Sequence, residues 1–425
     1  MTILLVVLIT IMALLGAPIF IVISAFAMIG FYLTEIPLAA IIVDIYSNFS
    51  SQPLLYTIPL FTFAGYILAE SKTSIRLVNF SKAILGWLPG GLAIVALCTC
   101  AFFTAFTGAS GVTIIALGGL LYPSLIKEKY PESFSLGLLT SSGSLGLLFP
   151  PSLPIILFGV VSQTSINQLF AAGLIPGVFL IIILSLYSIF RGKRASVPKK
   201  KFSFIEVFKA VNEAKWELLI PAVVVVGIYG GFFTLGEIAA ITVAYALIIE
   251  VFIHRDIKIT AIPSIMKRSM ILVGGILVIL GAAYGLTNYM IDAEIPMVIL
   301  DFMQRYITSK VVFLLTLNIF LLIVGCVLDI FSAILVTVPL ILPIAASYGI
   351  NPVHLGIIFL TNLEIGYSTP PVGMNLFISS FRFNKSVLSL YRATIPFLII
   401  LFIALMFITY MPQLSLWLVE HFNIK

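Results

Sequence analysis

The amino-acid sequence predicts an all-α polytopic membrane protein, built as an inverted structural repeat with two re-entrant hairpins and two broken helices. Of its 425 residues, 61% are hydrophobic and only 9% are charged, whereas about a quarter of an average soluble domain is charged. Its apolar runs are long and continuous, as in residues 397–410, which favours helices over the alternating strands of a membrane β-barrel. These observations exclude a soluble enzyme, and the runs predict roughly a dozen helical segments.

The charged residues predict an orientation in the membrane rather than a nucleic-acid partner. The formal net charge is +6, and eight of the 23 Lys and Arg residues fall within residues 191–217. Clustered basic residues mark the cytoplasmic side of a membrane protein, so this linker is predicted to be cytoplasmic. The three cysteines and three histidines form no metal-binding pattern, so neither a transition metal nor a cofactor is expected.

The two halves of the chain resemble each other in the positions of their prolines. Pro123 stands 27 residues before the Pro150–Pro151 pair, and Pro343 stands 27 residues before the Pro370–Pro371 pair. The loop after Pro123 is basic, whereas residues 344–354 contain no Lys or Arg, so the two copies are predicted to have opposite orientations. Repeats of opposite orientation are typical of secondary transporters. The alternative is a coincidence of Gly and Pro in apolar helices.

Each half contains two breaks in its apolar runs, and the breaks predict where ions bind. The first breaks, at residues 107–111 and 325–332, join short apolar runs and suit the tips of re-entrant hairpins. The second breaks, at residues 143–152 and 364–373, contain the proline pairs, which remove backbone donors and interrupt a helix. Interrupted backbone within a membrane lines a cavity or is buried in protein, and its free carbonyl oxygens suit Na⁺.

We therefore predict one Na⁺ site in each half, formed by the two breaks of that half. The alternative is that the prolines only kink helices for packing. The predicted Na⁺ ligands are oxygens of residues in the four breaks, namely Thr107, Gly108, Ser110, Gly143, Pro150, Gly325, Ser332, Gly366, Thr369 and Gly373.

Asp329 is the one charged residue within residues 311–342, at the second predicted hairpin tip. An unpaired carboxylate near the centre of a bilayer costs roughly 3 kcal/mol or more. We therefore interpret Asp329 as a substrate contact, together with Ser110 and Ser152 at the matching breaks of the first half. The alternative is a structural Asp that hydrogen-bonds the tip. Glu364 is the other deep acid, and it either contacts an ion or braces the broken helix.

Two basic amphipathic stretches, residues 71–85 and 257–270, predict horizontal helices that lie at the level of the lipid headgroups. One such arm in each half would brace a fixed scaffold. For the second stretch, the alternative is a simple basic loop.

Several short motifs, in this order and spacing, resemble the large membrane subunit of tripartite ATP-independent periplasmic (TRAP) transporters. They are IPLF at 58–61, GGLA at 90–93, FPPS at 149–152, AGLIPG at 172–177 and TPPVG at 369–373. The resemblance covers essentially the whole chain. It implies a Na⁺-driven, elevator-type importer of organic anions in the bacterial cytoplasmic (inner) membrane. It also implies two protein partners, a periplasmic substrate-binding protein and a small four-helix membrane subunit, here as a separate chain.

The resemblance also implies a division of the chain. Residues 1–86 would hold scaffold helices and the first arm, residues 87–190 the first half of the transport domain, and residues 191–217 the linker. Residues 218–309 would hold further scaffold helices and the second arm, and residues 310–425 the second half of the transport domain. The first tip reads TGAS at 107–110 where the family often has Ser-Gly-Ser, which leaves its Na⁺ ligands open. The sequence ASGVT at 109–113 resembles the sialic-acid branch of the family. Sialic acid is therefore favoured as the substrate, with C4-dicarboxylates next.

Two other function classes were weighed. An intramembrane enzyme needs an acid pair, a metal cluster or an activated Ser, and Asp329 and Glu364 are the only candidate partners, so an enzyme is not expected. A passive anion channel would show flux without coupling to a gradient, whereas inverted repeats with broken helices favour alternating access.

Overall fold

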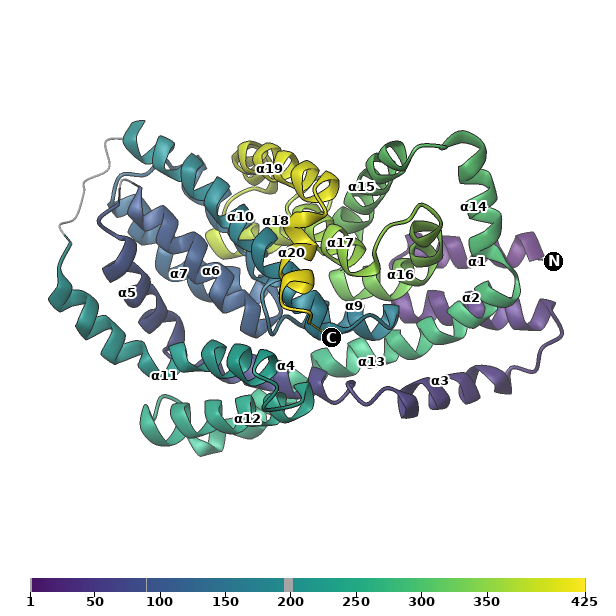
Figure 1. Cartoon of the computed structure of the whole chain (residues 1–425), viewed down its shortest axis with the longest axis horizontal. Coiled ribbons are helices and arrows are strands. Elements are labelled where there is room, and N and C mark those ends of the chain that lie inside the picture. Colours follow the sequence, from purple (N-terminus) through teal and green to yellow (C-terminus); the bar gives the residue numbers. More distant parts are fainter. Residues whose placement is uncertain (1, 89, 195–201, 425) are drawn as a thin grey trace.

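The computed structural model describes residues 2–88, 90–194 and 202–424, which are helical and contain no β-strand (Figure 1). The first half comprises α1 (Thr2–Leu14), α2 (Ile19–Leu33), α3 (Ala39–Ser51), α4 (Thr57–Glu70), α5 (Thr73–Leu85), α6 (Gly91–Thr107), α7 (Ser110–Lys127), α8 (Glu132–Ser142), η1 (Leu145–Leu148), α9 (Leu153–Ser162) and α10 (Ile166–Arg194). The second half comprises α11 (Phe204–Tyr229), α12 (Leu235–Leu247), η2 (Ile248–Ile253), η3 (Ile259–Ala261), α13 (Ile262–Asp292), α14 (Ile295–Tyr306), α15 (Lys310–Val327), α16 (Ile330–Ser347), α17 (Pro352–Gly366), α18 (Met374–Phe383), α19 (Val387–Tyr410) and α20 (Gln413–His421).

The helices agree with a multi-pass membrane protein. Within the described residues, seven helices are long and apolar enough to span a bilayer, and a bent pair, 132–148 with 153–162, makes an eighth. The described chain contains twenty α-helices, more than the roughly dozen segments that the apolar runs predict. The difference arises because several runs are divided into short helices, which is the pattern expected of re-entrant and broken segments.

The first residues of the repeated helices are offset by 219 to 221 positions, which confirms the predicted duplication. α7 and α16 each have 18 residues. They start at Ser110 and Ile330, the same separation of 220 positions that relates Ser144 to Glu364. α8 and α17 start at Glu132 and Pro352 with this same offset. The unit of α6, α7, α8, α9 and α10 therefore recurs as α15, α16, α17, α18 and α19.

The helices outside the two repeats pack mainly on one another. α13 packs against α2, α3 and α4, α12 packs against α4, and α11 packs against α5. Figure 1 shows α3, α4, α11, α12 and α13 along its lower edge, with the repeated helices above them. The division into a scaffold and a transport domain stays a prediction.

The first predicted arm is helical, its position at the headgroups stays a prediction, and the second predicted arm is not a separate helix. α5 forms a helix over most of residues 71–85. The second arm was wrong, because residues 262–270 are the first turns of the 31-residue α13 and not a separate helix. Pro263 stands at the start of α13, where proline is tolerated, and no proline follows to end the helix after Met270. The predicted linker is divided between the end of α10 and the start of α11, and its residues 195–201 lie outside the described residues.

Candidate transport site

The first hairpin turns at Gly108 and Ala109, between α6 and α7. Gly108 ends α6 in a left-handed conformation, with φ of 62°, and its N–H donates to Thr104 O across 2.8 Å. A side chain is disfavoured at this φ, and a Cβ at Gly108 would also lie 2.6 Å from the Leu153 side chain. Thr107 and Ser110 are buried on either side of the turn. The predicted first tip is therefore a tight, enclosed turn.

The first broken helix passes directly beside this hairpin. α8 ends at Ser142 and is followed by Gly143 and a short 3₁₀ turn, and the chain resumes as α9 after the Pro150–Pro151 pair. Thr104 Oγ1 donates to the carbonyl oxygen of Gly143 across 2.7 Å. The hairpin and the broken helix of the first half are thus in contact, as the sequence predicts. Ser152, at the N-terminus of α9, is fully buried.

The second hairpin turns at Asp329, and this carboxylate caps the helix that follows. Asp329 Oδ1 accepts hydrogen bonds from the N–H groups of Phe331, at 3.0 Å, and Ser332, at 3.1 Å. The Ser332 hydroxyl donates to Oδ2. These bonds satisfy free donors of the first turn of α16. Asp329 is only partly buried, so its carboxylate is hydrogen-bonded rather than isolated in hydrocarbon.

The second broken helix is bonded to the second hairpin through its backbone. The N–H of Gly373 donates to Cys326 O across 2.9 Å, and the N–H of Ile330 donates to the Tyr367 hydroxyl. Gly325 and Gly366 pack so closely that a Cβ at Gly366 would lie 2.6 Å from the Gly325 carbonyl carbon. Both predicted glycines therefore sit where two backbones meet. Thr369 hydrogen-bonds back to Ile365 O at 2.8 Å.

Contacts between the halves were not predicted from the sequence. Ser110 Oγ donates to Asn375 Oδ1 across 2.7 Å, so the first tip is bonded to the start of α18 in the second half. Ser144 Oγ donates to the backbone oxygen of Glu364 across 3.2 Å. Asn375 and Tyr367 are two of the polar residues that were not predicted from the sequence. Asn375 follows the Pro-Pro-Val-Gly break closely, and this position was the only available signal.

Buried oxygen atoms without a partner gather on the two broken helices. Among the described residues, the hydroxyls of Ser141, Ser152 and Ser368 have no hydrogen-bond partner, nor do Asn362 Oδ1 and both carboxylate oxygens of Glu364. Leaving a buried polar atom unpaired costs about 1–3 kcal/mol. These six atoms are hard oxygen donors of the kind that Na⁺ prefers. They lie on the two broken helices, but none belongs to a residue predicted as a Na⁺ ligand, so the predicted ligand set stays a prediction.

A second charged locus, the Arg76 cluster, joins α5 to helices of the second half. Arg76 Nη1 lies 2.6 Å from Asp256 Oδ2, its Nη2 lies 3.0 Å from Glu250 Oε2, and its Nε donates to Glu217. The Arg76 side chain is only 13% exposed, and those of Glu217 and Glu250 at most 1%. The Arg76 guanidinium is thus surrounded by three acids that are distant in the sequence, a set of contacts that the amphipathic pattern of residues 71–85 did not predict.

The cluster fixes the charge state of Asp256, which lies outside the apolar spans. Burial by itself would raise the pKa of the Asp256 carboxyl. The hydrogen bonds from Arg76 and from the backbone N–H of Lys72, with the charges of both side chains, outweigh burial and lower this pKa below its usual value. His254 Nε2 lies 3.4 Å from Glu217 Oε1 at the edge of the same cluster.

Comparison with known proteins places this geometry in one family. The family model described as "Tripartite ATP-independent periplasmic transporter, DctM component" matches residues 3–414. The C4-dicarboxylate TRAP transporter large permease protein DctM of Pseudomonas aeruginosa is 34% identical over 369 residues, covering 86% of each chain. The sialic acid TRAP transporter large permease protein SiaM of Vibrio cholerae is 32% identical over 408 residues, covering 93% of this chain and 95% of that one.

One relative is considerably longer than this chain. The isethionate TRAP transporter permease protein DctMQ of Oleidesulfovibrio alaskensis is 34% identical over 376 residues, and the match spans 88% of this chain but 59% of that protein. Among solved structures, the YdaH transporter of Alcanivorax borkumensis superimposes with a TM-score of 0.64 at 12% identity, covering 88% of each chain, which shows a shared fold. The relatives are named as transporter permeases, in agreement with the prediction of a transporter and not an enzyme. The chain belongs to the TRAP transporter family, as a large permease of the DctM type.

Proposed function

We propose that this permease is a Na⁺-coupled secondary active importer of an organic anion, working by elevator-type alternating access. The observation that carries the proposal is the set of six unpaired buried oxygens on the two broken helices, which belong to residues near the proposed Na⁺ ligands in the sequence and not to the ligands themselves. Oxygen atoms buried without partners are unfavourable, and a bound cation removes that cost. Broken helices in opposed repeats build ion and substrate sites in secondary transporters. No transition-metal site is part of this proposal.

The first Na⁺ site would use oxygens of Thr107, Gly108, Ser110, Gly143 and Pro150, and the second those of Gly325, Ser332, Gly366, Thr369 and Gly373. The hydrogen bond from Thr104 to Gly143 supports the first grouping. The hydrogen bond from Gly373 to Cys326 supports the second. In each half the hairpin tip and the break of the helix lie together, so carbonyl oxygens of both can face one ion.

Substrate would contact Ser110, Ser152 and Asp329. Ser152 has a buried, unpaired hydroxyl at the start of α9, and a helix N-terminus carries partial positive charge that suits a carboxylate. Asp329, being an acceptor, would bind substrate hydroxyls instead. A polyhydroxylated acid such as sialic acid matches both needs, and C4-dicarboxylates come next. The named relatives transport different compounds at similar identity, 34% for C4-dicarboxylate and 32% for sialic acid, so the choice rests on the site.

The partners in this proposal are a periplasmic substrate-binding protein and a small four-helix membrane subunit. In this proposal the small subunit is a separate chain. The protein would lie in the bacterial inner membrane with its basic linker in the cytoplasm, following the positive-inside rule.

The proposal is tested in proteoliposomes that contain the permease and its small subunit, with the binding protein outside. We expect labelled sialic acid to accumulate only when an inward Na⁺ gradient and the binding protein are both present. An equal inward K⁺ gradient is the control. Uptake that does not depend on Na⁺ would contradict the proposed coupling. Rapid equilibration of substrate without accumulation would favour a passive channel. Unlabelled C4-dicarboxylate and unlabelled sialic acid are then compared as inhibitors of this uptake. If C4-dicarboxylate inhibits at the lower concentration, the order of the two substrates is reversed.

A further inference from the structure

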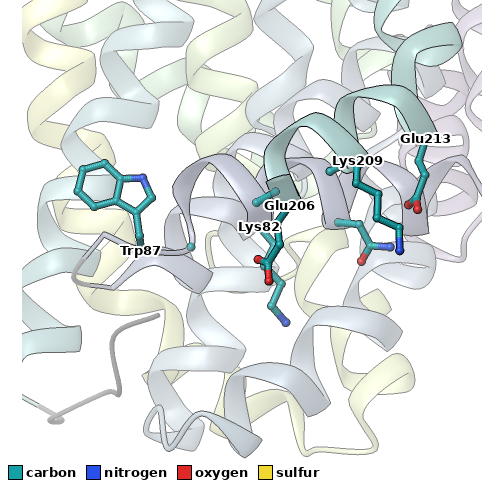
Figure 2. A pocket seen from close by; sticks show the side chains of 9 residues that line it. Lys82, Trp87, Glu206, Lys209 and Glu213 are labelled. Carbon is teal, nitrogen blue, oxygen red and sulfur yellow. The ribbon is translucent and has the colours of Figure 1, made fainter. Parts of the chain in front are cut away.

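A cavity of about 320 Å³ lies between α5 and the start of α11, away from the hairpins and broken helices. It is lined chiefly by Asn79, Lys82 and Trp87 on one side and by Glu206, Lys209 and Glu213 on the other. Figure 2 shows these side chains along the groove between the two helices, with Trp87 at one end and Glu213 at the other. The proposed transport cycle does not use this cavity.

The charges that line the cavity are balanced. Two ammonium groups, of Lys82 and Lys209, stand with two carboxylates, of Glu206 and Glu213. A purely anionic ligand would bring its charge close to both carboxylates, and like charges brought together are repelled. The ligand that complements all four groups is a zwitterion, with an anionic group for the lysines and a cationic hydrogen-bond donor for the glutamates.

The start of α11 also presents an apolar face to its surroundings. Phe204, Ile205 and Phe208 are 80%, 83% and 78% exposed, while Ala210 and Ala214 on the same helix are buried. Exposed apolar residues at this helical spacing are typical of a helix that lies in the membrane interface, with its apolar face among acyl chains.

An aromatic row connects the cavity to this apolar face. The Trp87 ring packs edge-on against Phe202 at 5.9 Å between centroids, and Phe202 packs against Phe204 at 4.8 Å. Trp87 also donates its indole N–H to Ile84 O across 2.8 Å, which fixes the ring at the mouth of the cavity. Tryptophan is enriched at the boundary between headgroups and hydrocarbon. A polar cavity and an apolar face thus meet at one residue, as the two parts of a lipid do.

We propose that this cavity binds the headgroup of a zwitterionic phospholipid with a primary amine, phosphatidylethanolamine. Its phosphate contacts Lys82 and Lys209, its ammonium donates to Glu206 and Glu213, and its acyl chains lie along Phe204 and Phe208. Phosphatidylcholine has the same charges, but its quaternary ammonium has no N–H to donate to a carboxylate. Phosphatidylglycerol lacks the cation altogether. The site therefore prefers the ethanolamine headgroup over both.

The test measures lipid binding to the delipidated full-length permease by native mass spectrometry, with phosphatidylethanolamine, phosphatidylcholine and phosphatidylglycerol of identical short acyl chains. The first variant is K82A/K209A, for which we expect phosphatidylethanolamine to bind about tenfold more weakly, since each lysine contributes about one phosphate contact. The second is E206Q/E213Q, which leaves both cations in place. Here phosphatidylethanolamine binding should weaken and phosphatidylglycerol binding should strengthen. The matched control, K258A/K267A, removes two exposed lysines elsewhere and should change neither lipid.

Equal binding of the three lipids to the wild type would overturn the proposal, and so would unchanged binding in K82A/K209A. The small membrane subunit is the other candidate to cover the apolar face of α11. A photocross-linking amino acid at position 208, in membranes that contain this subunit, distinguishes it from lipid. Cross-links to lipid support the proposal, and cross-links to protein oppose it. The readouts are independent of Na⁺-driven uptake, so this proposal and the transport proposal can fail separately.

Discussion

The Ser144 hydroxyl donates a hydrogen bond to the backbone oxygen of Glu364 across 3.2 Å, and the two residues are separated by the 220 positions that relate one repeat to the other. When two equivalent residues of a repeat contact each other, they lie close to the pseudo-twofold axis that relates the two repeats. The two broken helices therefore meet at their breaks, and both helices carry buried oxygens without a hydrogen-bond partner. A change at this junction acts on both halves together.

Gly366 tests how tightly the second broken helix packs on the second hairpin. A Cβ at this position would lie 2.6 Å from the carbonyl carbon and 2.7 Å from the Cα of Gly325, and backbone atoms have little freedom to move. We expect Gly366→Ala to lower the stability by about 1–3 kcal/mol, the usual cost of overpacking, as measured by unfolding in mixed micelles. Gly275→Ala is the control, because a Cβ there meets nothing within 4 Å. Equal stability of the two variants would contradict the close approach.

Arg76 tests the connection between α5 and the second half. Arg76→Gln removes the guanidinium from Glu217, Glu250 and Asp256. Of these three, only Asp256 keeps another Lys or Arg ion pair among the described residues, with Lys72 at 3.5 Å. Breaking a buried ion pair in this way costs about 3–5 kcal/mol. The control is Arg268→Gln, whose pair with Glu70 lies at 2.8 Å with side chains 49% and 41% exposed, and which should cost under about 1 kcal/mol. The unfolding free energies of both variants are measured. Similar losses of stability would mean that the ion pairs of Arg76 stabilise the fold no more than an exposed pair does.

The pH dependence of stability tests Asp256. Its pKa is lowered in the folded protein below the usual 3.8, so its ionised form stabilises the fold above that pH. This contribution is lost as the pH falls through the folded-state pKa. We expect the wild type to exceed Asp256→Asn in unfolding free energy at pH 7, and the difference to shrink when the pH is lowered below 3.8. A difference that stays constant across this range would show that charge is not the cause.

The sequence predicted the features that depend on local chain chemistry. Two consecutive prolines remove two backbone donors and interrupt a helix, so both broken helices were found at their observed places. Polar residues between short apolar runs likewise placed the tips before Ser110 and Ile330. The second arm failed for the converse reason, since nothing local separates a basic helix start from the long α13 that continues it.

Contacts between distant segments could not be predicted in this way. The bond from Ser110 to Asn375 joins residues 265 positions apart, and it exists because α7 packs on α18. The acids around Arg76 come from α11, η2 and the loop after η2. A single sequence gives charge and periodicity, but it does not say which helix faces which.

Asp329 separates the two interpretations that its sequence position left open. Asn caps a helix about as well as Asp, so Asp329→Asn should keep the bonds to Phe331 and Ser332 and unfold close to the wild type. Asp329→Ala removes the cap and should cost about 1 kcal/mol. If the carboxylate also binds substrate, Asp329→Asn should reduce Na⁺-driven uptake about tenfold to a hundredfold, the loss expected for a charged hydrogen bond. Folded Asp329→Asn with normal uptake would leave the carboxylate as a helix cap alone, and would move the substrate site to Ser110 and Ser152.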